Sequence, residues 1–172
     1  MDINLAGEIP NSLANGPGLR YVVFVQGCPH HCEGCHNQHT WEFKDNYIDT
    51  VDNVFERILK NTPYLDGLTI SGGEPFKQPK AVYELAKKVK ENLGLSIVCY
   101  TGYTYEQLKQ MSMYRDIDTT YRNKLLNIID ILIDGKFEVD NQEGHHRYAG
   151  SKNQRCLILE NGDIKGEVDW TT

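Results

Sequence analysis

Residues 68–102, LTISGGEPFKQPKAVYELAKKVKENLGLSIVCYTG, contain a short apolar strand, a glycine-rich loop, a helix and a second apolar strand. The helix is predicted between Pro79 and Gly94, because proline suits a first helical turn and glycine suits a helix end. Its inward residues recur every three or four positions and are Val82, Leu85, Ala86 and Val89. The flanking strands are predicted at 68–70 and 95–100. A strand–helix–strand unit of this kind is typical of a parallel sheet.

The same alternation of strand, loop and helix continues in both directions along the chain. We predict strands at 19–26, 128–133 and 156–159, helices at 51–59 and 104–113, and a helical turn at 122–127. The segment 114–121 is polar and has no clear periodicity. Asn161-Gly162 predicts a C-terminal hairpin over about 155–170. The whole pattern predicts a single α/β domain over 1–172, with its core at about 12–160 and a mainly parallel sheet.

Polar or glycine-rich loops follow four of the predicted strands, at 27–40, 71–76, 101–104 and 134–138. In open α/β sheets, ligands bind at the carboxyl ends of the strands. We therefore expect the functional site to be built from these loops.

The composition of the 172-residue chain excludes several classes of protein. A net charge of −6 argues against a broad basic surface for nucleic acid. No apolar run approaches the ~20 residues of a membrane span, and the N-terminus is unlike a signal peptide. Five cysteines in an odd, clustered arrangement do not resemble a disulfide framework, so we expect a reduced, cytoplasmic location.

Three of the cysteines lie close together after the first predicted strand, with the spacing Cys28-x3-Cys32-x2-Cys35. Thiolates are soft ligands that favour zinc, copper(I) or iron–sulfur clusters. A structural zinc site takes four ligands, and a nearby histidine would complete a Cys3His site. An iron–sulfur cube held by three cysteines would instead keep one iron open for another ligand. The triad alone leaves both possibilities open.

Two motifs at successive strand ends resemble those of the radical S-adenosylmethionine (SAM) superfamily. They are the cysteine triad and Ser71-Gly72-Gly73-Glu74-Pro75. Other segments resemble the glycyl-radical-enzyme activases of that superfamily, and especially the activases of anaerobic ribonucleoside-triphosphate reductase. These segments are Asn15-Gly16-Pro17-Gly18-x-Arg20, Phe24-x-x-Gly27-Cys28, Cys35-His36-Asn37-x-x-Thr40-Trp41, Thr101-Gly102-Tyr103, 130–137 and Gly150-Ser151-x-Asn153-Gln154-Arg155. Gly34 departs from the superfamily pattern, which often has an aromatic residue there.

The resemblance implies a [4Fe–4S] cluster held by Cys28, Cys32 and Cys35, with SAM bound to the fourth iron. It implies cofactor contacts from Ser71, Gly72, Gly73, Glu74, His36, Thr101, Asp134 and Lys136, and no catalytic residue beyond these ligands. The expected reaction is reductive cleavage of SAM to a 5′-deoxyadenosyl radical, which removes a hydrogen atom from a glycine of the reductase. The expected partners are that reductase and a one-electron donor such as a flavodoxin, with no nucleic acid and no membrane.

The short chain favours a partial, open β/α barrel of about five or six strands, because a closed barrel would obstruct a glycine carried by another protein. Cys99 and Cys156 are expected to be core residues, and His30, His31 and His39 to be loop residues rather than ligands. The alternatives are another small radical SAM enzyme, such as a formate-lyase activase or a 7-deazaguanine synthase, or a non-catalytic Cys3His zinc module.

Overall fold

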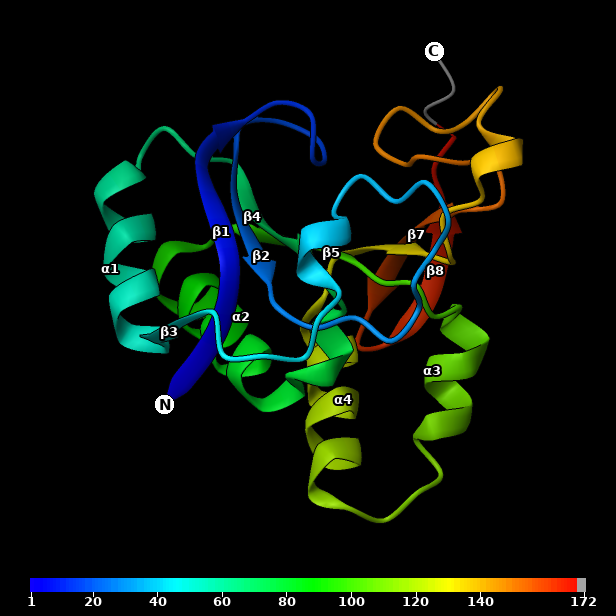
Figure 1. Ribbon diagram of the computed structural model, residues 1–172. Coiled ribbons are helices and arrows are strands. Elements are labelled where there is room, and N and C mark those ends of the chain that lie inside the picture. The colour runs from blue at the N-terminus through cyan, green and yellow to red at the C-terminus, as the bar shows by residue number, and fades with distance from the viewer. Residues whose placement is uncertain (170–172) are drawn as a thin grey trace.

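The computed structural model describes residues 1–169 and contains an open mixed sheet flanked by helices (Figure 1). The strands are β1 Asp2–Ser12, β2 Arg20–Val25, β3 Tyr47–Thr50, β4 Gly67–Gly72, β5 Ser96–Tyr100, β6 Ile131–Asp134, β7 Arg155–Glu160 and β8 Asp163–Glu167. They lie in the order β3-β1-β2-β4-β5-β6-β7-β8, so within the described residues the sheet does not close on itself. The expected α/β class with an open sheet is confirmed.

The four central strands β2, β4, β5 and β6 are parallel to one another, as the strand–helix–strand pattern predicts. Antiparallel strands extend the sheet at both edges, β1 and β3 on one side and β7 and β8 on the other. The described chain therefore forms eight strands rather than the five or six expected. Strands β1 and β3 were not predicted. Strand β1 has register shifts around Gly7 and after Ile9, which interrupt the alternation that marks a strand.

The helices are α1 Val51–Asn61, α2 Pro79–Leu93, α3 Tyr105–Met111 and α4 Ile117–Ile128, with short 3-10 turns at Gln38–Thr40, Pro75–Lys77 and Val139–Asn141. Helices α1, α2 and α4 pack in a row and share one core with the sheet. Local sequence explains several helix ends. The Thr50 side chain caps α1, a capping box of Thr104 and Gln107 starts α3, and Gly94 ends α2 in the left-handed conformation.

Helix α4 is longer than the turn predicted at 122–127, and it begins inside the polar segment 114–121. The Asp116 carboxylate accepts a hydrogen bond from the backbone N–H of Thr119 at 2.6 Å and so caps the helix. Only a few of its residues are buried, including Leu125 and Leu126, which is why the apolar pattern was weak.

Alternation along the strands separates the two faces of the sheet. Cys99 belongs to the core beneath the helices, whereas its neighbour Val98 packs with Cys156 on the opposite face. Ala149 covers this second face, so a loop takes the place of a helix there. Both Cys99 and Cys156 are fully buried, which confirms that they are core residues. The predicted hairpin is also present, as β7 and β8 joined at Asn161-Gly162.

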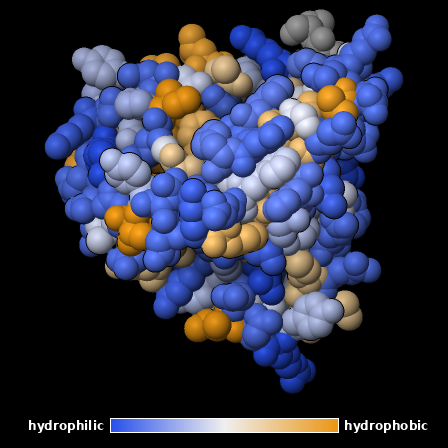
Figure 2. All heavy atoms as spheres, in the orientation of Figure 1, coloured by the Kyte–Doolittle hydropathy of each residue, from blue (hydrophilic) through white to orange (hydrophobic). Residues whose placement is uncertain are grey.

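Hydrophilic side chains predominate on the face of the molecule shown in Figure 2, and apolar side chains are scattered among them. None of the helices within residues 1–169 has the length and apolar character needed to cross a bilayer.

Candidate active site

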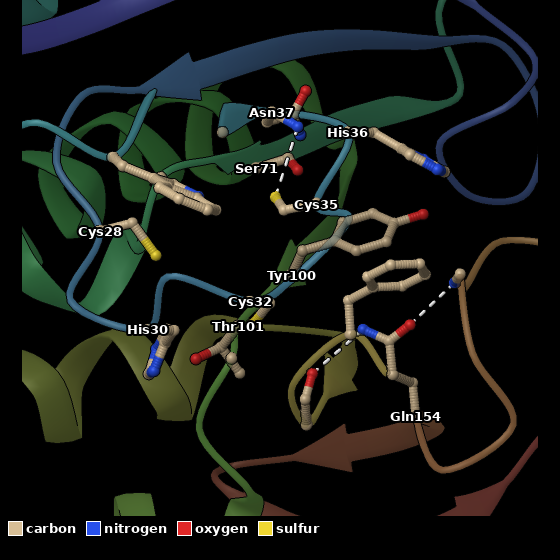
Figure 3. Close-up of a pocket in the computed structure, with 17 residues that line it drawn as sticks. Cys28, His30, Cys32, Cys35, His36, Asn37, Ser71, Tyr100, Thr101 and Gln154 are labelled. Carbon is tan, nitrogen blue, oxygen red and sulfur yellow. Dashed lines mark hydrogen bonds between the residues drawn. The ribbon is translucent and has the colours of Figure 1, made fainter. Parts of the chain in front are cut away.

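The cysteine loop and three other strand-end loops meet around one cavity at the carboxyl ends of the parallel strands (Figure 3). All three clustered cysteines line it, together with Ser71 and Gly72 at the end of β4, Gly73 directly after it, Thr101 after β5, and Phe137 after β6. These segments are far apart in sequence, and the parallel register of β2, β4, β5 and β6 aligns their ends.

Backbone hydrogen bonds hold the cysteine loop closed on itself. The N–H of Gly27 donates to the carbonyl of Thr40 at 2.7 Å, and the N–H of Cys28 donates to the carbonyl of Trp41 at 3.0 Å. Gly27 turns the chain out of β2 with a φ of 99°, a conformation that side chains disfavour. The two ends of the loop 27–41 are thus bonded to each other, and the cysteines between them line the cavity.

The cysteine thiols are partly buried. Burial raises the pKa of Cys28 to about 11, and burial also raises the pKa of Cys32. The Cys35 sulfur accepts a hydrogen bond from the backbone N–H of Asn37 at 3.3 Å. Because metal ligation requires thiolates, metal binding at this site would release protons.

The residues of the cavity fit an iron–sulfur cluster in two respects. The donor set is three soft thiols in the wall of one cavity, which residues from the other strand ends also line. In the same wall, the indole N–H of Trp41 is buried and has no acceptor among the described residues, so it can donate to a group that enters the cavity. No three His, Cys, Asp or Glu side chains of residues 1–169 converge closely enough to hold a single ion.

The Ser71-Gly72-Gly73 segment lies directly against the start of the cysteine loop. A Cβ on Gly72 would come within 2.4 Å of the backbone nitrogen of Val25, and one on Gly73 within 2.3 Å of the carbonyl oxygen of Gly27. The N–H of Gly73 also donates to the carbonyl of Val25 at 2.8 Å. Glycine is therefore required at both positions for the backbone to approach this closely.

Glu74 is 1% exposed and does not line the cavity, although it follows the glycines directly. Its carboxylate accepts hydrogen bonds from His30 Nε2 at 2.7 Å, Thr101 Oγ1 at 2.8 Å and the N–H of Gly102 at 2.8 Å. A fourth bond comes from the N–H of Phe76 at 3.1 Å. His30, expected to be a plain loop residue, is thus a direct partner of Glu74. No local sequence signal marks this pairing, because the two residues are 44 positions apart.

The remaining predicted site residues divide into two groups. His36 and Thr101 line the cavity, and the His36 ring lies 5.4 Å from that of Phe137. Asp134 is buried elsewhere, where it binds Arg155 and the N–H of Tyr105. Lys136 is exposed, and neither it nor Asp134 is part of the cavity lining.

Gln154 lines the cavity and ties two of its loops together, a role that sequence reasoning did not identify. Its Oε1 accepts a hydrogen bond from the N–H of Gly150 at 2.8 Å, and its Nε2 donates to the carbonyl of Gly135 at 3.0 Å (Figure 3). The same Oε1 also accepts from the N–H of Ser151 at 3.0 Å. The short segment 150–154 is therefore held across the end of β6.

Residues 14–157 match the model of the 4Fe-4S single cluster domain, which defines an iron–sulfur protein of the radical SAM type. Proteins named anaerobic ribonucleoside-triphosphate reductase-activating protein are similar over nearly their whole length. The one from Enterobacteria phage T4 is 35% identical, with 89% of this chain and 92% of that protein covered. The chain belongs to the family of these activating proteins.

Two bacterial relatives with the same name have similar values. The protein from Vibrio cholerae is 35% identical, with 84% of this chain and 91% of that protein covered. The protein from Escherichia coli (strain K12) is 31% identical, with 84% and 92% covered. Among solved structures, QueE from Escherichia coli matches with a TM-score of 0.47 and 20% identity, over 60% of this chain and 54% of that one.

Proposed function

We propose that this protein cleaves SAM reductively at a [4Fe–4S] cluster and generates a glycyl radical on anaerobic ribonucleoside-triphosphate reductase. The observation that carries the proposal is one cavity lined by three clustered cysteines and by the glycine-rich end of β4. Membership of the activating-protein family, over most of the chain, supports the identity of the protein substrate.

Cys28, Cys32 and Cys35 would hold the cluster, and residues from the other strand ends line the same cavity. When bound, the cluster supplies the electron that breaks the carbon–sulfur bond of SAM to give methionine and a 5′-deoxyadenosyl radical. Ser71, Gly72 and Gly73 would bind the methionine part of SAM, because their backbone groups are accessible at the cavity wall.

The other wall of the cavity would limit the access of water. Tyr100 and Phe137 line it as aromatic surfaces, and Gln154 holds its loops in place. Thr101 also lines the cavity and is available to a polar group of SAM, although its hydroxyl already donates to Glu74. The contacts predicted for Asp134 and Lys136 with SAM stay predictions.

The open sheet is compatible with a protein substrate. The strands lie in a linear order from β3 to β8, and within residues 1–169 these two edge strands do not pair to close a barrel. A loop of another protein can therefore approach between the two edges of the sheet. A one-electron donor such as a flavodoxin would reduce the cluster. Because the family's chemistry requires free thiols, we further propose a reducing, cytoplasmic location.

The test is anaerobic reconstitution followed by three measurements. We expect brown protein with about four irons per chain, formation of methionine and 5′-deoxyadenosine from SAM under reducing conditions, and a glycyl electron paramagnetic resonance (EPR) signal after mixing with the reductase. Colourless protein with one zinc per chain would contradict the proposal and favour the zinc module. SAM cleavage without a glycyl signal would favour another small radical SAM enzyme.

A further inference from the structure

We propose that His30 and Glu74 form a positioning pair that holds the cluster-binding loop and the SAM-binding strand ends in register, and that Glu74 does not itself contact SAM. The inference rests on the proposed function and concerns the same site.

The Glu74 carboxylate has no remaining capacity for a ligand. An ionised carboxylate has about four acceptor positions, two on each oxygen. Oε1 accepts from Phe76 and Thr101, and Oε2 accepts from His30 and Gly102. The side chain is also 0% exposed, so an ammonium group of SAM could reach it only by displacing one of these donors.

The four donors come from three loops that the mechanism must align. His30 belongs to the cysteine loop, Phe76 to the turn after Glu74, and Thr101 and Gly102 to the end of β5. His30 lies between two cluster ligands, two positions from each of Cys28 and Cys32. Its bond to Glu74 therefore sets where the cysteine loop lies relative to the SAM-binding glycines. A buried, fully satisfied network of this kind specifies one arrangement.

The surroundings of His30 are shaped for its ring. The side chain is 6% exposed, and the Tyr103 ring packs edge-on against it with centroids 4.5 Å apart. A Cβ on Gly102 would lie 2.3 Å from His30 Cδ2 and 2.7 Å from Nε2, inside any permitted contact. Gly102 has no positive φ that would otherwise demand glycine. Clearance for the imidazole is thus the steric reason for glycine at this position.

Five variants separate this role from direct SAM contact, and one of them, Glu74→Gln, changes the acceptor itself. His30→Phe keeps a ring against Tyr103 but removes the N–H donor, and His30→Gln returns an amide N–H at a reach similar to that of Nε2. Gly102→Ala displaces the ring without changing either polar residue. His39→Phe makes the same chemical change at an exposed position of the same loop and is the matched control.

The measurements are iron per chain after anaerobic reconstitution and the SAM dissociation constant, read from the change that SAM causes in the EPR spectrum of the reduced cluster. We expect every variant to retain wild-type iron. We expect His30→Phe and Gly102→Ala to raise the dissociation constant about tenfold, the scale of one hydrogen bond to a charged group. His30→Gln should recover most of that loss, and His39→Phe should match the wild type.

Three results would overturn the inference. The first is wild-type SAM binding by His30→Phe. The second is a loss confined to Glu74→Gln, which would indicate direct contact between Glu74 and SAM. The third is loss of iron in both His30 variants, which would assign His30 to the cluster itself. If the wild-type protein binds a cluster whose spectrum SAM does not alter, the proposed function fails, and the inference with it.

Discussion

Arg155 binds one buried and one exposed carboxylate, and the buried one is expected to account for most of its contribution to stability. Its guanidinium donates to both oxygens of Asp134, from Nε at 3.1 Å and Nη2 at 2.6 Å. It also donates to both oxygens of Glu106, at 3.1 and 2.7 Å. The Asp134 side chain is 1% exposed, whereas that of Glu106 is 64% exposed.

The expected loss in the free energy of unfolding depends on which group each substitution leaves without its partner. Arg155→Met would leave Asp134 buried with one identified donor, the N–H of Tyr105 at 2.8 Å. Removing one partner of a buried ion pair costs about 3–5 kcal/mol, and we take the lower end because the Arg155 side chain is 32% exposed. Glu106→Gln removes only a solvent-exposed partner, at a cost of about 0.5 kcal/mol.

The assay is urea unfolding of wild type and both variants, prepared alike under anaerobic, reducing conditions. With a denaturant slope of about 2 kcal/mol per M, Arg155→Met should lower the free energy of unfolding by about 3 kcal/mol and the midpoint by about 1.5 M. Glu106→Gln should lower the midpoint by about 0.25 M. Equal losses in the two variants would refute the reasoning, because burial would then not determine the strength of the pair.

Three further predictions concern the site and the core. Cys28→Ala should abolish cluster assembly and SAM cleavage, whereas Cys99→Ser should retain wild-type iron, because Cys99 is buried in the core; iron analysis decides both. Gly73→Ala should abolish SAM binding, because the added Cβ would lie 2.3 Å from the Gly27 carbonyl oxygen. If SAM changes the EPR spectrum of the reduced cluster in this variant as it does in the wild type, the close approach is contradicted. Burial raises the pKa of Tyr21 from 10.0 to about 12. The contribution of its neutral phenol to the free energy of unfolding is therefore fully present below pH 10 and is lost as the pH rises to 12. In Tyr21→Phe, the free energy of unfolding should no longer fall between pH 10 and pH 12 for this reason. The same fall in the variant as in the wild type would exclude Tyr21 as its source.

The central helices were predicted well because the residues that start and end them lie within a few positions of each other in the sequence. The Thr104–Gln107 capping box and the Gly94 helix end act within one helical turn, and both are present. Strand β1 was missed because its register shifts hide the alternation. Helix α4 was predicted too short because it starts in a polar segment, and its Asp116 cap is a weak signal without an apolar stripe.

Local sequence is sufficient to place three cysteines in one loop after a strand, and glycine-rich and polar segments at the ends of the next parallel strands. These features depend on spacing and on the two-residue and 3.6-residue periods of the chain. The binding of Asp134 to Arg155, away from the cavity, and the saturation of Glu74 by His30 and its neighbours depend on tertiary contacts. Those pairings join residues 21 to 44 positions apart. They form because strand order and register bring particular side chains within hydrogen-bond distance, which no local pattern encodes.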